Sequence, residues 1–165
     1  MMRSLAWTWT VLLLTLAALS SVASAQSADA NKAKDRLTGD AKGSAAANPQ
    51  CKLFTPAEIS AYLGVTVGAG QNAAGGAGCS WTDKDDEAQA IVTVVGPAYF
   101  PEPSLVKGFK RLPGIGKKAW VAPDAGWSAG ALLDDAAVVV GLDGKKANEA
   151  AVVALLQETL KRRKK

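Results

Sequence analysis

Apolar and polar residues change their spacing along the chain, and these changes divide it into a leader, a polar stretch and a folded domain. An uncharged apolar run extends from Leu5 to Val22, and residues 26–50 contain Leu37 as their one large apolar residue. From Cys51 onward, short β-branched runs stand between two segments whose apolar residues recur every three or four positions. Such recurrence is typical of helices and such runs are typical of strands, so a sheet between two helices is predicted.

The first helix is predicted from its start and stop signals. Thr55 is placed to cap the helix, Pro56 to occupy its first position and Glu58 to complete a capping box. Gly64 supplies a left-handed stop. The apolar residues between these signals fall on one face of the helix, and they are Ile59, Tyr62 and Leu63.

Five strands are predicted between the two helices, as a hairpin and a three-stranded meander. The strands are expected at residues 79–82, 90–95, 118–122, 127–133 and 136–142. The C-terminal segment is amphipathic from Lys145 through Leu160 and is long enough to cover a sheet face. The predicted fold class is therefore α+β, with an antiparallel sheet of about five strands and both helices packed on one face.

Two stretches between these elements are predicted from their composition. Residues 68–78 are rich in Gly, Ala and Asn and lack the G-x-x-x-x-G-K-[ST] pattern of a phosphate loop, so they are expected to form a loop without regular structure. Residues 104–112 are expected to form a short helix, because Leu105 and Phe109 would then meet on one side.

The acidic hairpin turn at residues 83–87 lacks the glycine and distal glutamate of a calcium loop and is interpreted as a solvated tip.

The N-terminal residues have the pattern of an export signal. Positive charge precedes the apolar run, and Ala23-Ser24-Ala25 is a small-x-small site of the kind that signal peptidase accepts. Residues 1–25 are therefore predicted to be a cleaved signal peptide, with an uncleaved transmembrane helix as the alternative. Gln26 stands where a lipoprotein signal needs a cysteine, so no lipid anchor is expected. The predicted location is periplasmic or secreted.

The remaining chain is predicted to contain one domain. Residues 26–50 have too little apolar surface to fold and are predicted to be a disordered linker. Residues 51–160 are predicted to be a single α+β domain, followed by a basic tail at residues 161–165. Cys51 and Cys79 are the only cysteines, and in an exported chain they are expected to form a disulfide that holds the first helix to the first strand.

The formal net charge of +4 is concentrated at the C-terminus. Residues 51–160 contain nine basic and twelve acidic residues, so the domain itself is mildly acidic and a nucleic-acid partner is not expected. The tail is interpreted as a solvated helix end that suits the helix macrodipole. Weak contact with anionic lipid or lipopolysaccharide is the alternative, through Lys161, Arg162, Arg163, Lys164 and Lys165.

Residue types that carry catalysis are scarce. The sequence contains no histidine, which removes Ser-His and Cys-His nucleophile pairs and the usual zinc and copper sites. Asp124, Asp134 and Asp135 remain as candidate paired acids, but they fall in predicted turns, where carboxylates are solvated. We therefore expect no enzyme activity, no cofactor and no metal.

Three tryptophans follow the predicted signal peptide, and each lies on a predicted strand. Trp81, Trp120 and Trp127 would serve as a ligand platform if their rings were exposed, although packing beneath a helix is the more usual role. Trp127 stands next to a turn and is expected to be the most exposed of the three.

A resemblance to a known group of proteins rests on several short signatures. They are Cys51, Leu53, Thr55, Glu58, Ile59, Leu63-Gly64, Cys79-Ser80-Trp81, Leu112-Pro113-Gly114-Ile115-Gly116 and Ala119-Trp120. Over residues 51–160 the chain resembles small exported bacterial proteins of unknown function with a Cys-x-Trp motif, many of them actinobacterial lipoproteins. The resemblance implies a disulfide-stabilised exported α+β domain and transfers no catalytic residues. The chain departs from this group because it has no lipobox cysteine.

These observations favour an exported, non-enzymatic binding or accessory domain whose partner is an unidentified protein or envelope component. The alternative is an envelope-associated protein that the basic tail attaches to anionic surfaces. A weaker alternative is an inhibitor of a secreted enzyme.

Overall fold

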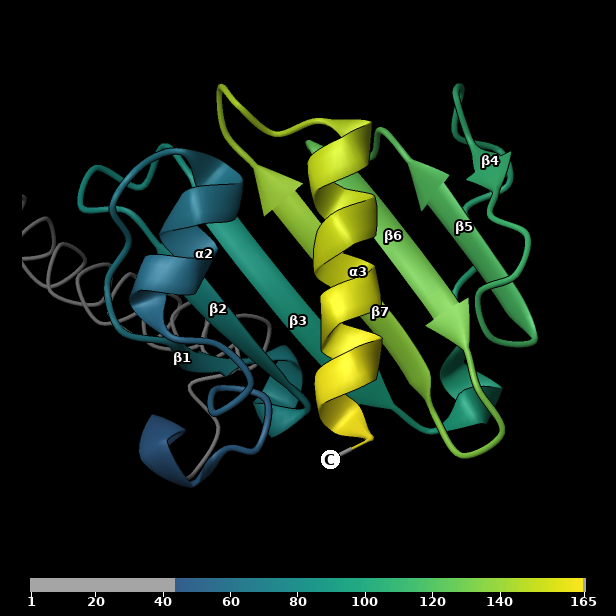
Figure 1. The fold of residues 1–165 in the computed structure, drawn as a ribbon, viewed down its shortest axis with the longest axis horizontal. Helices are drawn as coiled ribbons and strands as arrows, with labels where there is room; N and C mark the ends of the chain where they lie inside the picture. The colour runs from purple at the N-terminus through teal and green to yellow at the C-terminus, as the bar shows by residue number, and fades with distance from the viewer. Residues whose placement is uncertain (1–43, 165) are drawn as a thin grey trace, which may run out of the picture. The chain divides into compact units, whose positions relative to one another are not determined.

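The computed structural model describes residues 44–164, which fold around a seven-stranded antiparallel sheet with the strand order β1-β2-β3-β7-β6-β5-β4 (Figure 1). The strands are β1 Gln71–Ala73, β2 Gly78–Thr82, β3 Gln89–Val95, β4 Lys110–Arg111, β5 Lys118–Ala122, β6 Trp127–Leu132 and β7 Ala137–Asp143. The predicted signal peptide, the predicted linker up to residue 43 and Lys165 lie outside the described residues.

Two α-helices lie on the same face of the sheet, α2 Pro56–Leu63 and α3 Glu149–Arg163 (Figure 1). Short 3-10 helices occur at η1 Ala45–Ala47, η2 Ala74–Gly76 and η3 Pro97–Tyr99. The fold is therefore α+β with a C-terminal helix, as the sequence predicts. Within residues 44–164, neither α2 nor α3 combines the length and the apolar character that a membrane span requires.

The hydrophobic core fills the space between the helices and the sheet. Ile59 and Leu63 of α2 and Leu155 and Leu156 of α3 are almost fully buried against alternate residues of the central strands. Alternation places the side chains of every second strand residue on the helix side. The sheet residues that take part in this core are Cys79, Trp81, Ala90, Val92, Ala119, Val121, Ala129, Ala131, Val138, Val140 and Leu142.

The first α-helix begins and ends at its predicted residues. The N–H of Glu58 donates to Thr55 Oγ1 over 3.3 Å, and the N–H of Thr55 donates to Glu58 Oε2 over 2.8 Å, which completes the capping box. Gly64 adopts the left-handed conformation with φ 69°. α2 is not the first helix of the described chain, because η1 precedes it.

The predicted number of strands is wrong by two. β1 lies within residues 68–78, which were expected to lack regular structure, and it pairs with β2 from Gln71↔Ser80 to Ala73↔Gly78. A three-residue edge strand depends on backbone pairing rather than on a side-chain pattern, so its composition gives no signal.

β4 replaces the short helix predicted at residues 104–112. Gly108 has a φ of 91°, and the neighbouring hydrogen bonds close single turns instead of a helix. Lys110 and Arg111 then pair with Val121 and Trp120 of β5. The spacing of Leu105 and Phe109 is therefore not helical, because the left-handed glycine between them ends any helical run.

The ends of the domain also differ from their predicted positions. α3 begins at Glu149 rather than at Lys145, because the side chain of Asn148 accepts from the N–H of Ala151 over 2.9 Å and caps the helix there. The helix continues to Arg163, past the predicted boundary at residue 160. At the other end, residues 44–50 of the predicted linker belong to the fold, as the contacts of Asn48 show below.

Candidate functional site

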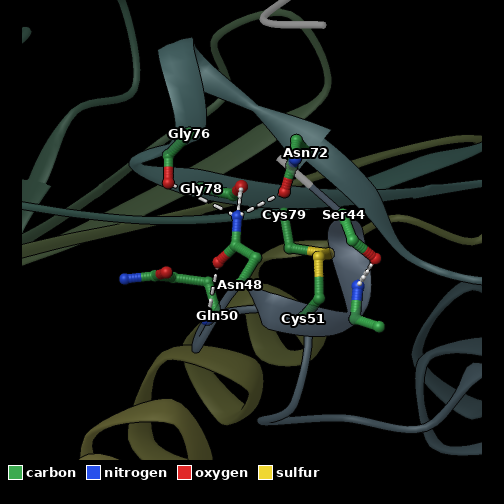
Figure 2. The surroundings of a disulfide bond; sticks show 9 residues. Ser44, Asn48, Gln50, Cys51, Asn72, Gly76, Gly78 and Cys79 are labelled. Carbon is green, nitrogen blue, oxygen red and sulfur yellow. Dashed lines mark hydrogen bonds between the residues drawn. A yellow bond between two sulfur atoms is a disulfide. The ribbon is translucent and has the colours of Figure 1, made fainter. Parts of the chain in front are cut away.

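The disulfide connects Cys51, ahead of α2, with Cys79 of β2, and their Cα atoms lie 5.1 Å apart (Figure 2). Cys79 is fully buried, and no described cysteine is free. The bond confirms the pairing predicted from the sequence. It holds the segment that leads into α2 against the edge of the sheet.

Asn48 holds the preceding residues against the same edge. Figure 2 shows its side-chain amide pointing at β1 and the start of β2, where Nδ2 donates to Asn72 Oδ1 over 2.8 Å and to the carbonyl of Gly78 over 2.9 Å. Its Oδ1 accepts from the N–H of Gln50 over 2.9 Å. Asn48 is 7% exposed, so these bonds satisfy a polar group that is removed from water. The contacts of Asn48 therefore stabilise the fold at this edge of the sheet.

Among the residues of the predicted basic tail, Arg162 departs most from the predicted solvated position. Its guanidinium donates from Nη2 to Glu58 Oε1 over 2.8 Å, from Nε to Glu158 Oε1 over 2.8 Å and from Nη1 to the carbonyl of Leu53 over 2.6 Å. It also lies over the ring of Phe54, 4.4 Å from the centroid. The interpretation of the tail as a solvated helix end is therefore wrong for Arg162.

These contacts perturb the acid–base properties of both partners. The hydrogen bond from Arg162, together with those from the backbone and side chain of Thr55, lowers the pKa of Glu58 from 4.5 to about 2. The hydrogen bonds to Glu58 and Glu158 raise the pKa of Arg162 above its ordinary value. Arg162 is thus a fixed positive charge that joins the last turn of α3 to the first turn of α2.

The other described tail residues are less constrained. Arg163 donates to Asp135 over 2.9 Å, and Lys161 lies 3.5 Å from Glu158. Lys164 forms no ion pair with any described residue, and Lys165 lies outside the described range. Attachment to an anionic surface through this segment stays a prediction. Because Arg162, Arg163 and Lys161 already form ion pairs within the protein, fewer unpaired charges are available for this attachment.

The tryptophans do not form a shared platform. Trp81 is fully buried in the core, and Trp120 is 3% exposed, with its Nε1–H donating to the carbonyl of Pro101 over 2.7 Å. Trp127 packs against the core but is only half-buried, whereas Trp81 and Trp120 are buried. Trp127 is therefore the most exposed of the three. In this structure the rings of Trp81 and Trp120 offer no surface to a ligand.

The described carboxyl groups whose pKa is displaced take part in ion pairs. The carboxyl groups with a displaced pKa are Glu58, Glu102, Asp135 and Glu158, and in each the largest cause is a hydrogen bond from an arginine that lowers the pKa. Residues 44–164 also contain no group of three or more side chains placed to hold a metal ion.

A cleft of about 770 Å³ lies between residues 65–68, which follow α2, and residues 82–85, at the end of β2. Two backbone contacts join these walls, the N–H of Gly68 donating to the carbonyl of Thr82 over 2.9 Å and the bridge between Val67 and Asp83. The N–H of Val67 also donates to Ser60 Oγ over 3.1 Å, which ties the first wall to α2. The cleft is thus built on fixed elements.

The lining of the cleft is mainly apolar with polar groups around it. Val65 is 41% exposed and is one of few large apolar side chains in the described chain that reach solvent to this extent. Thr66, Lys84 and Asp85 contribute polar groups. Asp83 Oδ1 accepts from the N–H groups of Glu87 and Ala88, both over 2.9 Å, so this carboxylate closes the hairpin turn. Apolar clefts of this size with a few polar groups are the usual form of small-ligand sites.

Sequence reasoning missed this cleft because its two walls are distant in the chain and contain no residue type linked to a reaction. The sequence predicts the acidic turn at residues 83–87 but gives no indication that the turn lies beside Val65. Two other hollows are less suitable. One of about 500 Å³ is bordered by the ion pairs Lys117–Asp134 and Arg163–Asp135, and one of about 230 Å³ includes Gly141 and Asp124.

Comparison with known proteins gives no relative, since no family model, no curated protein and no solved structure matches the chain. The resemblance to small exported proteins with a Cys-x-Trp motif therefore stays a prediction. The disulfide between Cys51 and Cys79 is consistent with an oxidising location outside the cytoplasm.

Proposed function

We propose that this protein is an exported, non-enzymatic binding domain that takes a small apolar ligand, or an apolar side chain of a partner, into the cleft between residues 65–68 and 82–85. The observation that carries the proposal is the exposure of Val65 inside a mainly apolar cleft of about 770 Å³. When a ligand covers an apolar side chain that is in contact with water, the burial of that apolar surface favours binding.

The character of the rim indicates what kind of ligand fits. Thr66 offers a hydroxyl group, and Lys84 and Asp85 form an exposed ion pair at 3.6 Å whose members are free to rearrange. A ligand with an apolar body and one hydrogen-bonding end would use both parts of the site.

The test uses a neutral apolar probe, N-phenyl-1-naphthylamine, and amide chemical shifts recorded by NMR. We expect the largest shifts at residues 65–68 and 82–85. We expect Val65→Lys to abolish them, whereas Tyr99→Lys is the matched control, because Tyr99 is also exposed, at 77%, but lies outside the cleft. Shifts that cluster elsewhere, or that persist unchanged in Val65→Lys, would contradict the proposal.

A further inference from the structure

The segment between β3 and β4 is an irregular chain that is firmly attached to the sheet. Trp120 of β5 donates to the carbonyl of Pro101, and the ring of Phe109 lies 6.4 Å from that of Trp120. Glu102 forms ion pairs with Arg111 and with Lys118 at 3.3 and 3.4 Å. These contacts fix both sides of the segment and leave residues 104–107 as its tip.

Leu105 lies at this tip and is completely exposed, at 100%. The tip is a closed turn, since the N–H of Val106 donates to the carbonyl of Pro103 and the N–H of Phe109 to the carbonyl of Val106, both over 3.0 Å. A leucine on a backbone fixed in this way contributes nothing to the core of the domain. The side chain of Leu105 is therefore free to contact another apolar phase.

Basic residues surround this tip in a domain that is otherwise acidic. Residues 96–118 contain five basic residues and one acidic residue, whereas the rest of residues 51–160 contain four basic and eleven acidic residues. Lys107 forms no ion pair with any described residue. Lys110 and Arg111 form ion pairs with Glu149 and Glu102, but their side chains remain about 60% exposed, at 59% and 61%. Such exposed pairs exchange partners easily.

The basic residues gather along one edge of the sheet. β4 is the edge strand in the order β1-β2-β3-β7-β6-β5-β4, at the right of Figure 1, and the acidic β2–β3 turn is separated from it by the strands between. The edge therefore combines an exposed leucine with Lys107, Lys110 and Arg111. Positive charge beside an apolar side chain is the combination that binds the interface of an anionic bilayer.

We propose that the tip at residues 104–107 and the β4 edge form a docking surface for an anionic phospholipid membrane. Leu105 enters the boundary between headgroups and acyl chains, and Lys107, Lys110 and Arg111 contact lipid phosphates. A tip with a single fully exposed apolar side chain suits a fluid bilayer, which deforms around it, better than a rigid protein, which would need a matching pocket. This surface is separate from the cleft at Val65, so either proposal can fail without the other.

The experiment measures co-sedimentation of the exported, purified protein with phosphatidylglycerol–phosphatidylcholine vesicles and with vesicles of phosphatidylcholine alone. We expect binding to the anionic vesicles that weakens with salt, a loss of about tenfold in Leu105→Ser, and a loss of about fivefold with a smaller salt dependence in Lys107→Gln. Thermal unfolding of both variants should match the unchanged protein, because both side chains are exposed.

Tyr99→Ser is the matched control. Tyr99 follows β3, whose last residue Val95 pairs with Ala137 at the start of β7, whereas Gly108 lies against Pro123 at the end of β5, so the two sites are at opposite ends of the sheet. Tyr99→Ser should bind vesicles as the unchanged protein does.

A second variant, Leu105→Trp, reports on insertion directly, because the emission of the introduced tryptophan should shift to the blue on anionic vesicles. The proposal is overturned if the unchanged protein does not bind anionic vesicles or if Leu105→Ser binds them equally well. It is also overturned if the emission of the introduced indole does not shift when the vesicles are added.

Discussion

The guanidinium of Arg162 lies 2.8 Å from the carboxylate of Glu58, although the two residues are 104 positions apart in the chain. The pair fastens the last turn of α3 to the capping box at the start of α2, and it does so at the protein surface, where both side chains are partly exposed, at 28% and 41%. A single arginine thus connects the two helices that cover the sheet.

Replacing Arg162 by Ala should lower the free energy of unfolding by about 2 kcal/mol, because hydrogen bonds to a carbonyl and two carboxylates are lost. Lys161→Ala is the matched control and should cost less than about 0.5 kcal/mol, since the ammonium of Lys161 forms one exposed pair. Urea denaturation measures both. Equal midpoints for the two variants would show that Arg162 does not link the helices.

The same pair should make stability depend on pH in the acidic range. The folded-state pKa of Glu58, about 2, lies below the ordinary value of 4.5, so its contribution is complete above pH 4.5 and is lost as the pH falls from 4.5 toward 2. Glu58→Gln should reduce this part of the dependence without removing it, because the pKa values of Glu158, Asp135 and Glu102 are lowered as well. Thermal unfolding between about pH 6 and pH 2 gives the comparison, and identical pH profiles would contradict the assignment.

Removing the N-cap of α2 should have a smaller, local effect. Thr55→Ala removes the acceptor for the N–H of Glu58 and should lower stability by about 1 kcal/mol. Thr55→Ser keeps that acceptor and should remain close to the unchanged protein. Chemical denaturation distinguishes the two, and a loss as large in Thr55→Ser would mean that the methyl group, not the cap, stabilises the helix.

Asn48 tests whether the domain extends into the predicted linker. Asn48→Ala should lower stability by about 2 kcal/mol, because the carbonyl of Gly78 and the side chain of Asn72 each lose a buried donor. Ser44→Ala affects an exposed bond in the same segment and should change little. If both substitutions are silent in denaturation experiments, residues 44–50 do not contribute to the folded domain.

The disulfide should contribute more than any of these contacts. Replacing both Cys51 and Cys79 by Ser opens a loop with a sequence separation of 28 and should lower stability by about 3 to 4 kcal/mol. Mass measurement after thiol alkylation, with and without reductant, checks the bond itself. Two alkylated thiols in the unreduced, denatured protein would show that the bond is absent.

The parts of the fold that the sequence predicts are those encoded by neighbouring residues. The capping box at Thr55 and Glu58 and the strands of the meander depend on contacts a few positions apart, and they were located to within one or two residues. β1 and β4 are two or three residues long and exist only because β2 and β5 offer them backbone partners. The side-chain pattern of these two short strands does not predict them.

The candidate site was less predictable for the same reason. Val65 and Asp85 approach each other through the pairing of Gly68 with Thr82, which is a tertiary contact, and neither residue type indicates binding. The position of Arg162 among five basic residues predicts a solvated tail, because its partners Glu58 and Leu53 are far away in the chain.

The placement of β7 between β3 and β6 has a consequence for how the chain reaches this structure. β3 pairs with β7 along its whole length, from Gln89↔Asp143 to Val95↔Ala137, so the middle of the sheet needs residues that emerge from the ribosome late. Until they emerge, one edge of β3 has no neighbour. A nascent chain that ends before residue 137 therefore lacks the strand that joins β3 to β6, and the sheet can be completed only after nearly all of the domain has been synthesised.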